Sequence, residues 1–153
     1  MSSSDRIEKE VLLRAPRSRV WEAVGDSREF GKWFNAVLEG PFEPGKTLHG
    51  TITEPGWEGT RFVVFVERVE PGRHLSFRWH PYPAGPEAVG DSATPTTLVS
   101  FDLNDAPDGT RLRIVESGFD AIPFDRRTDA RKSNDEGWTI QAERIAKHVA
   151  KTA

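Results

Sequence analysis

Alternating apolar and polar residues mark several short segments of the chain, and this is the pattern of half-buried β-strands. In the first segment, residues 6–14, Ile7, Val11 and Leu13 fall on one face. Pro and Gly pairs such as Pro71-Gly72 separate the later segments, as turns do. Further strands are predicted at 46–53, 61–70, 73–80, 96–103 and 110–116. The spacing predicts an antiparallel sheet with one apolar face.

Two short helices are predicted between the first and second of these strands. In the first helix, Ser18 is a candidate N-cap ahead of Val20, Trp21 and Val24. The second helix fits residues 28–34, where Phe30, Trp33 and Phe34 lie at helical spacing.

The C-terminal segment predicts a long amphipathic helix. Its apolar stripe is formed by Trp138, Ala142, Ile145 and Val149. Ser133 and Glu136 have the spacing of a capping box, which places the start of the helix near Asn134. Residues 126–132 form either a separate turn or an earlier start of the same helix. A sheet with one apolar face must bury that face against another element. The amphipathic helix can pack on it, and this combination indicates an α+β fold.

Three segments carry a resemblance to a known family: APRSRVWEAVGDSREFGKWF at 15–34, PGRHLSFRW at 71–79, and GTRLRIVESGF at 109–119 followed by GW at 137–138. With these, the chain resembles the SRPBCC, or START-like, superfamily, and within it the branch of the heat-shock-protein-90 ATPase activator. The resemblance implies the helix-grip fold, an antiparallel sheet curved around a long C-terminal helix, over residues 1–153 as one domain. It also implies an elongated cavity between sheet and helix, lined by apolar and aromatic side chains.

Composition narrows the functions open to the chain. It has 153 residues, a net charge of −3 and no cysteine, which excludes a disulfide scaffold and thiolate metal sites. A basic nucleic-acid binder is disfavoured by the net charge. No apolar run approaches the roughly 20 residues of a membrane helix. The first ten residues lack the apolar core of a secretory signal, so we expect a cytoplasmic protein.

Motifs for metal, nucleotide and nucleophile chemistry are missing from the sequence. The four histidines, His49, His74, His80 and His148, show no metal-ligand spacing. No phosphate-binding glycine loop and no nucleophile elbow occur. We therefore expect no metal and no cofactor.

Glu116 is the most informative charged residue, because alternation places it on the inward face with Leu112 and Ile114. It is either a polar anchor for a ligand, a general acid/base, or a structural carboxylate paired with an arginine. Trp57 lies in a loop and is a candidate gate or partner contact. The predicted ligand-binding residues are Trp33, Phe34, Phe77, Trp79, Tyr82, Leu112, Ile114, Glu116 and Trp138.

The leading hypothesis is a binding module for a small apolar or amphipathic molecule, with aromatic cavity walls and few polar groups. A cofactor-independent cyclase, dehydratase or hydrolase is the alternative, with Glu116 and either His80 or Tyr82 as a titratable pair. A protein-interaction module of the co-chaperone kind is the third hypothesis. No nucleic-acid partner and no membrane insertion are expected.

Overall fold

The computed structural model describes residues 6–80, 96–122 and 124–151. The predicted loop at 83–95 and Tyr82 lie outside these ranges. The described strands form one antiparallel sheet in the order β1-β7-β6-β5-β4-β3-β2. Their bounds are β1 Arg6–Leu13, β2 Ala36–Leu38, β3 Thr47–Ile52, β4 Arg61–Glu70, β5 His74–Trp79, β6 Thr97–Ala106 and β7 Gly109–Ser117.

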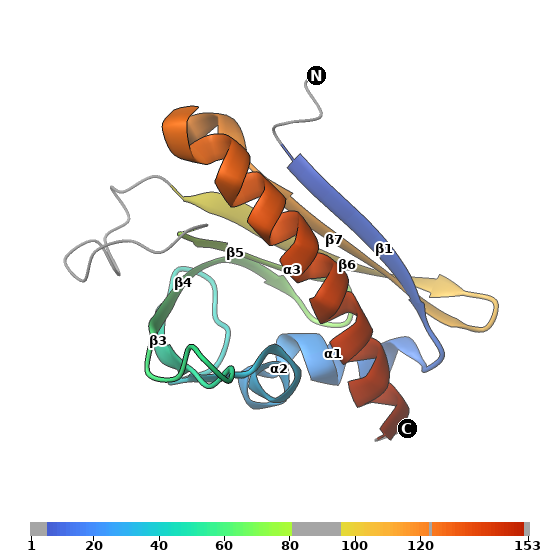
Figure 1. Ribbon diagram of the computed structural model, residues 1–153. Helices are drawn as coiled ribbons and strands as arrows, with labels where there is room; N and C mark the ends of the chain where they lie inside the picture. Colours follow the sequence, from blue (N-terminus) through green and yellow to red (C-terminus); the bar gives the residue numbers. More distant parts are fainter. Residues whose placement is uncertain (1–5, 81–95, 123, 152–153) are drawn as a thin grey trace.

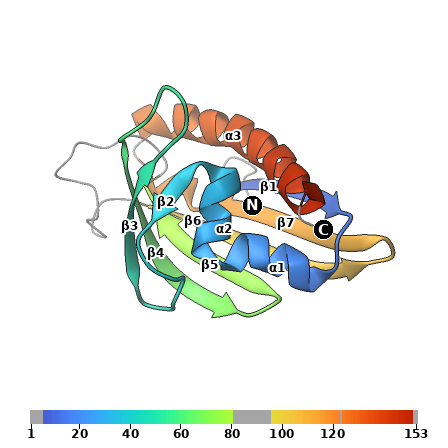
Figure 2. The ribbon, with the colours of Figure 1, turned by 90° about the horizontal axis from the view of Figure 1, so that it is seen from below.

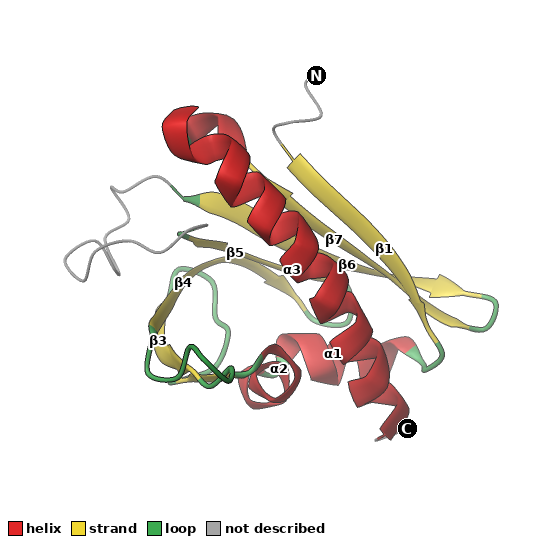
Figure 3. Cartoon of the chain, viewed as in Figure 1, coloured by secondary structure: helices red, strands yellow, loops and turns green. Residues whose placement is uncertain are grey.

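Three α-helices accompany the sheet, and their bounds are α1 Arg17–Gly25, α2 Ser27–Phe34 and α3 Phe124–Lys151. The long helix α3 runs across the hollow face of the curved sheet (Figures 1 and 3). The short helices α1 and α2 lie together at the end where α3 finishes (Figure 2). The helix-grip α+β fold is thereby confirmed. No helix in the described part of the chain is long and apolar enough to cross a membrane.

A cluster of aromatic rings fills the space between the sheet and the helices. Phe30 of α2, Phe77 of β5 and Phe101 of β6 have no solvent exposure. Their ring centroids lie 5.9 to 6.1 Å apart, within the range of favourable ring pairs. Much of the space in which we expected an elongated cavity is therefore packed core.

The helix α3 begins ten residues before Asn134, so the earlier of the two predicted starts is correct. Ser133 and Glu136 lie inside the helix and do not form a capping box at its start. The buried face continues through Ala130, which extends the apolar stripe by two turns. Trp138, Ile145 and Val149 are buried as predicted, whereas Ala142 is half-buried.

Two smaller features differ from the prediction. The N-cap position of α1 is Pro16, with no capping hydrogen bond from a side chain, so Ser18 is not a cap. Strand β2 was not predicted, because three residues are too few to show an alternating pattern.

The boundary between α1 and α2 is formed by Asp26, whose carboxylate accepts hydrogen bonds from the backbone N–H groups of Arg28 and Glu29.

The C-terminal end of α3 is tied to α2 through polar side chains. His148 Nε2 lies 2.8 Å from Glu29 Oε1, and the Lys32 ammonium donates to the other Glu29 oxygen at 3.0 Å. His148, followed by Lys32, lowers the pKa of Glu29 from 4.5 to about 2. A carboxylate with a lowered pKa stabilises the fold above its unfolded pKa and loses that contribution as the pH falls.

We therefore predict that Glu29 contributes to acid unfolding between pH 4.5 and pH 2. The Glu29→Gln variant has no carboxylate to protonate, so its free energy of unfolding should fall less steeply than that of the wild type in this window. Urea unfolding at a series of pH values measures the two slopes. Identical slopes would contradict the role of this contact.

Two isoleucines of α3 test the orientation of the helix. Ile145 is fully buried and Ile140 is 51% exposed. Ile145→Ala should lower the free energy of unfolding by about 2–5 kcal/mol, because it leaves a cavity in the core. Ile140→Ala should change it by less than about 0.5 kcal/mol. Equal losses in chemical denaturation would show that the helix face is assigned wrongly.

Candidate functional site

Glu116 lies on β7 with a fully buried side chain, and its carboxyl group accepts hydrogen bonds from four other side chains. The indole Nε1 groups of Trp79 and Trp138 donate to it at 2.9 and 2.8 Å. Thr97 Oγ1 lies at 2.5 Å, and Asn134 Nδ2 reaches both carboxyl oxygens at 3.1 and 3.0 Å. A buried carboxyl group that is fully hydrogen-bonded avoids most of the cost of its lost hydration.

The strands place Glu116 in the interior of the sheet. Glu116 pairs with Ile7 of β1 on one side and with Val99 of β6 on the other, so β7 has a neighbouring strand on each side at this position. Its side chain points to the face that carries Leu112 and Ile114, as alternation predicts.

The expected arginine partner of Glu116 is not found among the side chains that the structure describes. All four hydrogen-bond partners are uncharged, and the described ion pairs do not include this carboxyl group. Of the three predicted roles, the arginine-paired one therefore does not fit the geometry. Glu116 instead links β5, β6 and α3 through neutral donors.

A pocket with a volume of about 250 Å³ lies over these donors, between α3 and the sheet. Trp79, Asn134 and Trp138 line it, and each also donates to Glu116. The described residues that line the pocket are Phe34, Trp79, Ser133, Asn134, Gly137, Trp138 and Gln141.

Three aromatic rings form the apolar part of this pocket. Trp79 and Trp138 are stacked, with centroids 5.6 Å apart and planes inclined by 20°. Phe34 lies 5.8 Å from Trp79 and 6.4 Å from Trp138. Phe34 and Trp79 are half-buried, which leaves part of each ring accessible.

The predicted ligand-binding residues fall into two groups. Phe34, Trp79 and Trp138 come together at the pocket, and Glu116 lies beneath it. Four others are buried in the core and are not part of this lining: Trp33, Phe77, Leu112 and Ile114. Trp33 instead donates from its indole nitrogen to the Ala23 carbonyl oxygen at 2.8 Å, which fixes α2 against α1. Tyr82 lies outside the described residues.

The sequence interpretation missed the polar half of the lining. Asn134 precedes Trp138 by four residues and Gln141 follows it by three, so all three share one helix face. That spacing was available in the sequence. A helix start near Asn134 would leave this residue at the helix end, whereas α3 begins at Phe124 and places Asn134 within the helix.

A cluster of three polar side chains, Asn35, Glu54 and Arg144, stabilises the wall of the pocket beside Phe34. Arg144 donates to both oxygens of Glu54 at 2.5 and 3.1 Å, and Asn35 Nδ2 donates to Glu54 at 3.1 Å. Arg144, followed by Asn35, holds the pKa of Glu54 below its usual value. Because Asn35 directly follows Phe34, this contact ties the end of α2 to α3.

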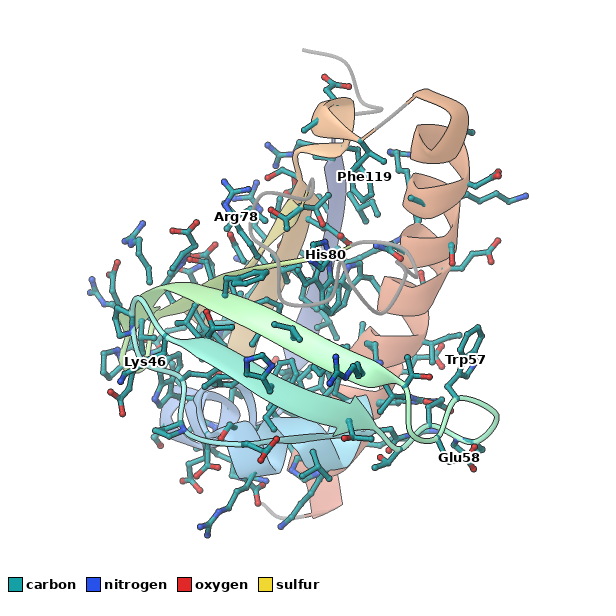
Figure 4. All side chains as sticks on the ribbon, turned by 90° about the vertical axis from the view of Figure 1, so that its left-hand side faces the viewer. Lys46, Trp57, Glu58, Arg78, His80 and Phe119 are labelled. Atoms are coloured by element: carbon teal, nitrogen blue, oxygen red, sulfur yellow. The ribbon has the colours of Figure 1, made fainter. Side chains whose placement is uncertain are left out.

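None of the four histidines is among the described residues that line the pocket. His74 pairs with Asp102 at 2.7 Å, and the His80 ring packs edge-on against Phe65 with centroids 6.1 Å apart. No group of three or more potential metal ligands occurs among the described residues. Figure 4 shows Trp57 in the loop between β3 and β4, and its side chain is 60% exposed.

Residues 14–150 match the family described as Activator of Hsp90 ATPase homolog 1-like protein. The chain belongs to this family. No curated protein matches the sequence significantly.

Solved structures share the fold. A Mesorhizobium loti protein is 22% identical with a TM-score of 0.75, over 97% of this chain and 98% of that one. DynU16, a putative protein in the dynemicin biosynthetic locus, is 26% identical with a TM-score of 0.72, over 95% of this chain and 47% of that one. The Aha1 dimer from Colwellia psychrerythraea is 14% identical with a TM-score of 0.69, over 94% and 95%.

The hydrogen bonds of Glu116 generate a prediction for Glu116→Gln. Whichever way the new amide turns, its NH2 group faces an indole or amide donor, so a buried polar group is left without a partner. The free energy of unfolding should fall by about 1–3 kcal/mol. At about 2–4 °C per kcal/mol, the melting temperature should fall by roughly 2–12 °C.

Thermal unfolding measures this loss, and Glu143→Gln is the matched control. Glu143 is exposed on the same helix that supplies Asn134 and Trp138, and its change should leave the melting temperature within about 2 °C. A Glu116→Gln variant as stable as the wild type would contradict the four-donor geometry.

Proposed function

We propose that the protein binds a small apolar or amphipathic molecule in the pocket between the sheet and α3. The observation that carries the proposal is the convergence of Phe34, Trp79 and Trp138 on one open space. Ligand sites are typically concave, mostly apolar, and provided with a few fixed polar groups. Burial of a ligand's apolar surface contributes about 25 cal/mol per Å², before the costs of association.

The fixed orientation of the pocket's polar groups also supports binding. Glu116 holds the two indole rings and the Asn134 amide in place from below. A site that is ordered before the ligand arrives loses less conformational entropy on binding. DynU16 is described as a putative protein in a biosynthetic locus, a setting that suits a protein that handles small molecules.

Catalysis is the weaker alternative. The seven lining residues include no titratable side chain. Glu116 is engaged in hydrogen bonds with four side chains, and the His80 ring packs against Phe65 and is not among the described lining residues. A general acid or base has to lie within hydrogen-bond reach of the proton that it transfers. Because neither Glu116 nor His80 is placed in this way, the geometry favours a binding protein.

A neutral aromatic dye, N-phenyl-1-naphthylamine, tests the proposal. We expect saturable binding that quenches tryptophan emission and is unchanged by a chelator. Phe34→Leu should weaken the affinity by roughly three- to tenfold, because it removes one aromatic contact. Fluorescence titration measures the dissociation constants.

Trp57→Phe is the control, since Trp57 is exposed and is not part of the pocket lining. Its affinity for the dye should equal that of the wild type. A lack of saturable binding would sink the proposal. Loss of binding in Trp57→Phe alone would move the site to the exposed loop and favour a contact surface instead.

A further inference from the structure

Gly137 is the single glycine within α3, and it lines the pocket. It follows Asn134 by three residues and precedes Gln141 by four, so the three share the helix face over the pocket. Glycine is one of the poorest helix formers, so its position in the middle of a 28-residue helix calls for a reason.

The packing of the protein does not supply that reason. A Cβ atom added at Gly137 would meet no atom of the described residues within 4 Å, apart from the backbone of the adjacent helical turns. At Gly31 and Gly50, by contrast, a Cβ would lie 2.1 and 2.2 Å from backbone oxygens, so those glycines are needed for close approach. The missing side chain at Gly137 keeps space free within the pocket, and no close contact among the described residues requires it.

The space over Gly137 is bordered by flat aromatic surfaces. The stacked indoles of Trp79 and Trp138 form one side, and the ring of Phe34 lies within 6.4 Å of either. The volume of about 250 Å³ lies just below the range of drug-sized sites. It suits a planar molecule of one or two fused rings.

The polar groups at the edge of this space include two amide oxygens, those of Asn134 and Gln141. The Asn134 amide nitrogen faces Glu116, which turns the amide oxygen away from the carboxyl group. The Gln141 amide nitrogen faces the Phe34 carbonyl oxygen at 3.5 Å, and the Gln141 oxygen is buried without a hydrogen-bond partner. A ligand that donates a hydrogen bond would satisfy the Gln141 oxygen once this side chain turns toward the pocket.

An anionic ligand would find little support in the same lining. None of the seven described lining residues carries a positive charge, and the donors left for a ligand are the Ser133 hydroxyl and the second N–H of the Gln141 amide. The Glu116 carboxyl group lies directly beneath, with no cation paired to it among the described residues. A buried anion without a cation or several donors is costly.

We infer that Gly137 is a specificity-determining position, at which a planar aromatic ligand with a hydrogen-bond-donating edge lies against the backbone of α3. The inference rests on the proposed function and deepens it by naming the ligand class. The absent side chain admits the flat ring, and the Gln141 oxygen together with the lack of a cation in the described lining selects a hydroxyl or amine over a carboxylate.

Three naphthalenes of equal ring size test the polar edge: 2-naphthol, 2-methoxynaphthalene and 2-naphthoate. We expect 2-naphthol to bind about fivefold more tightly than 2-methoxynaphthalene, which lacks the donor although it is the more apolar of the two. We expect 2-naphthoate to bind at least about tenfold more weakly than 2-naphthol. Calorimetry and tryptophan quenching measure the affinities.

Gly137→Ala tests the position itself. The methyl group meets no atom of the described residues beyond the adjacent helical turns, so the melting temperature should rise by roughly 2–4 °C through the better helix propensity. The affinity for 2-naphthol should fall at least about tenfold, because the methyl group occupies the ligand's space. Thr139→Ala, at an exposed position two residues away, should leave the affinity unchanged.

The outcomes separate this inference from the proposed function. Equal affinity of Gly137→Ala and wild type for 2-naphthol overturns the inference, as does equal binding of the three compounds. A lower melting temperature together with lost binding also overturns it, because the methyl group would then disturb the fold. If the naphthalenes and N-phenyl-1-naphthylamine all fail to bind, the proposed function itself is wrong.

Discussion

A buried carboxyl group requires hydrogen-bond donors, and at Glu116 this requirement joins the helix to the sheet. The donors come from β5, from the start of β6 and from α3, so they meet only when the helix crosses the sheet at one place. Loss of that alignment would leave a buried polar group unsatisfied, which costs more than a single hydrogen bond contributes. The interaction therefore fixes the position of α3 along the sheet as well as its rotation.

The pocket is a consequence of the same arrangement. Trp79, Asn134 and Trp138 turn their N–H groups toward Glu116, and the same three side chains contribute to the pocket lining, with Trp138 only 2% exposed. Farther along α3, Arg144 and Glu54 hold the end of α2, and with it Phe34, against the helix. The aromatic walls are thus held from two directions by polar contacts, while Gly137 leaves the space between them unfilled.

The sequence predicted the parts of this structure that depend on local periodicity. The six longer strands, the amphipathic helix and the inward direction of Glu116 all follow from residue spacing. The partners of Glu116 do not, because Trp79 lies 37 residues away and Thr97 lies 19 residues away in the chain. A buried carboxylate suggested an arginine, whereas four neutral donors fulfil the same electrostatic need. The division of the aromatics into core and pocket wall likewise depends on tertiary packing, which alternation alone does not determine.

The indole N–H resonances of a ¹⁵N-labelled sample test the central claim most directly, during a titration with 2-naphthol. The account predicts that the Trp79 and Trp138 signals are protected from exchange with solvent, because both donate to a buried carboxyl group. It also predicts that these two signals shift on addition of the ligand, while the exposed Trp57 signal exchanges rapidly and stays in place. Single Trp→Phe variants assign the signals. Unprotected Trp79 and Trp138 signals that do not move, together with shifts at Trp57, would contradict the account.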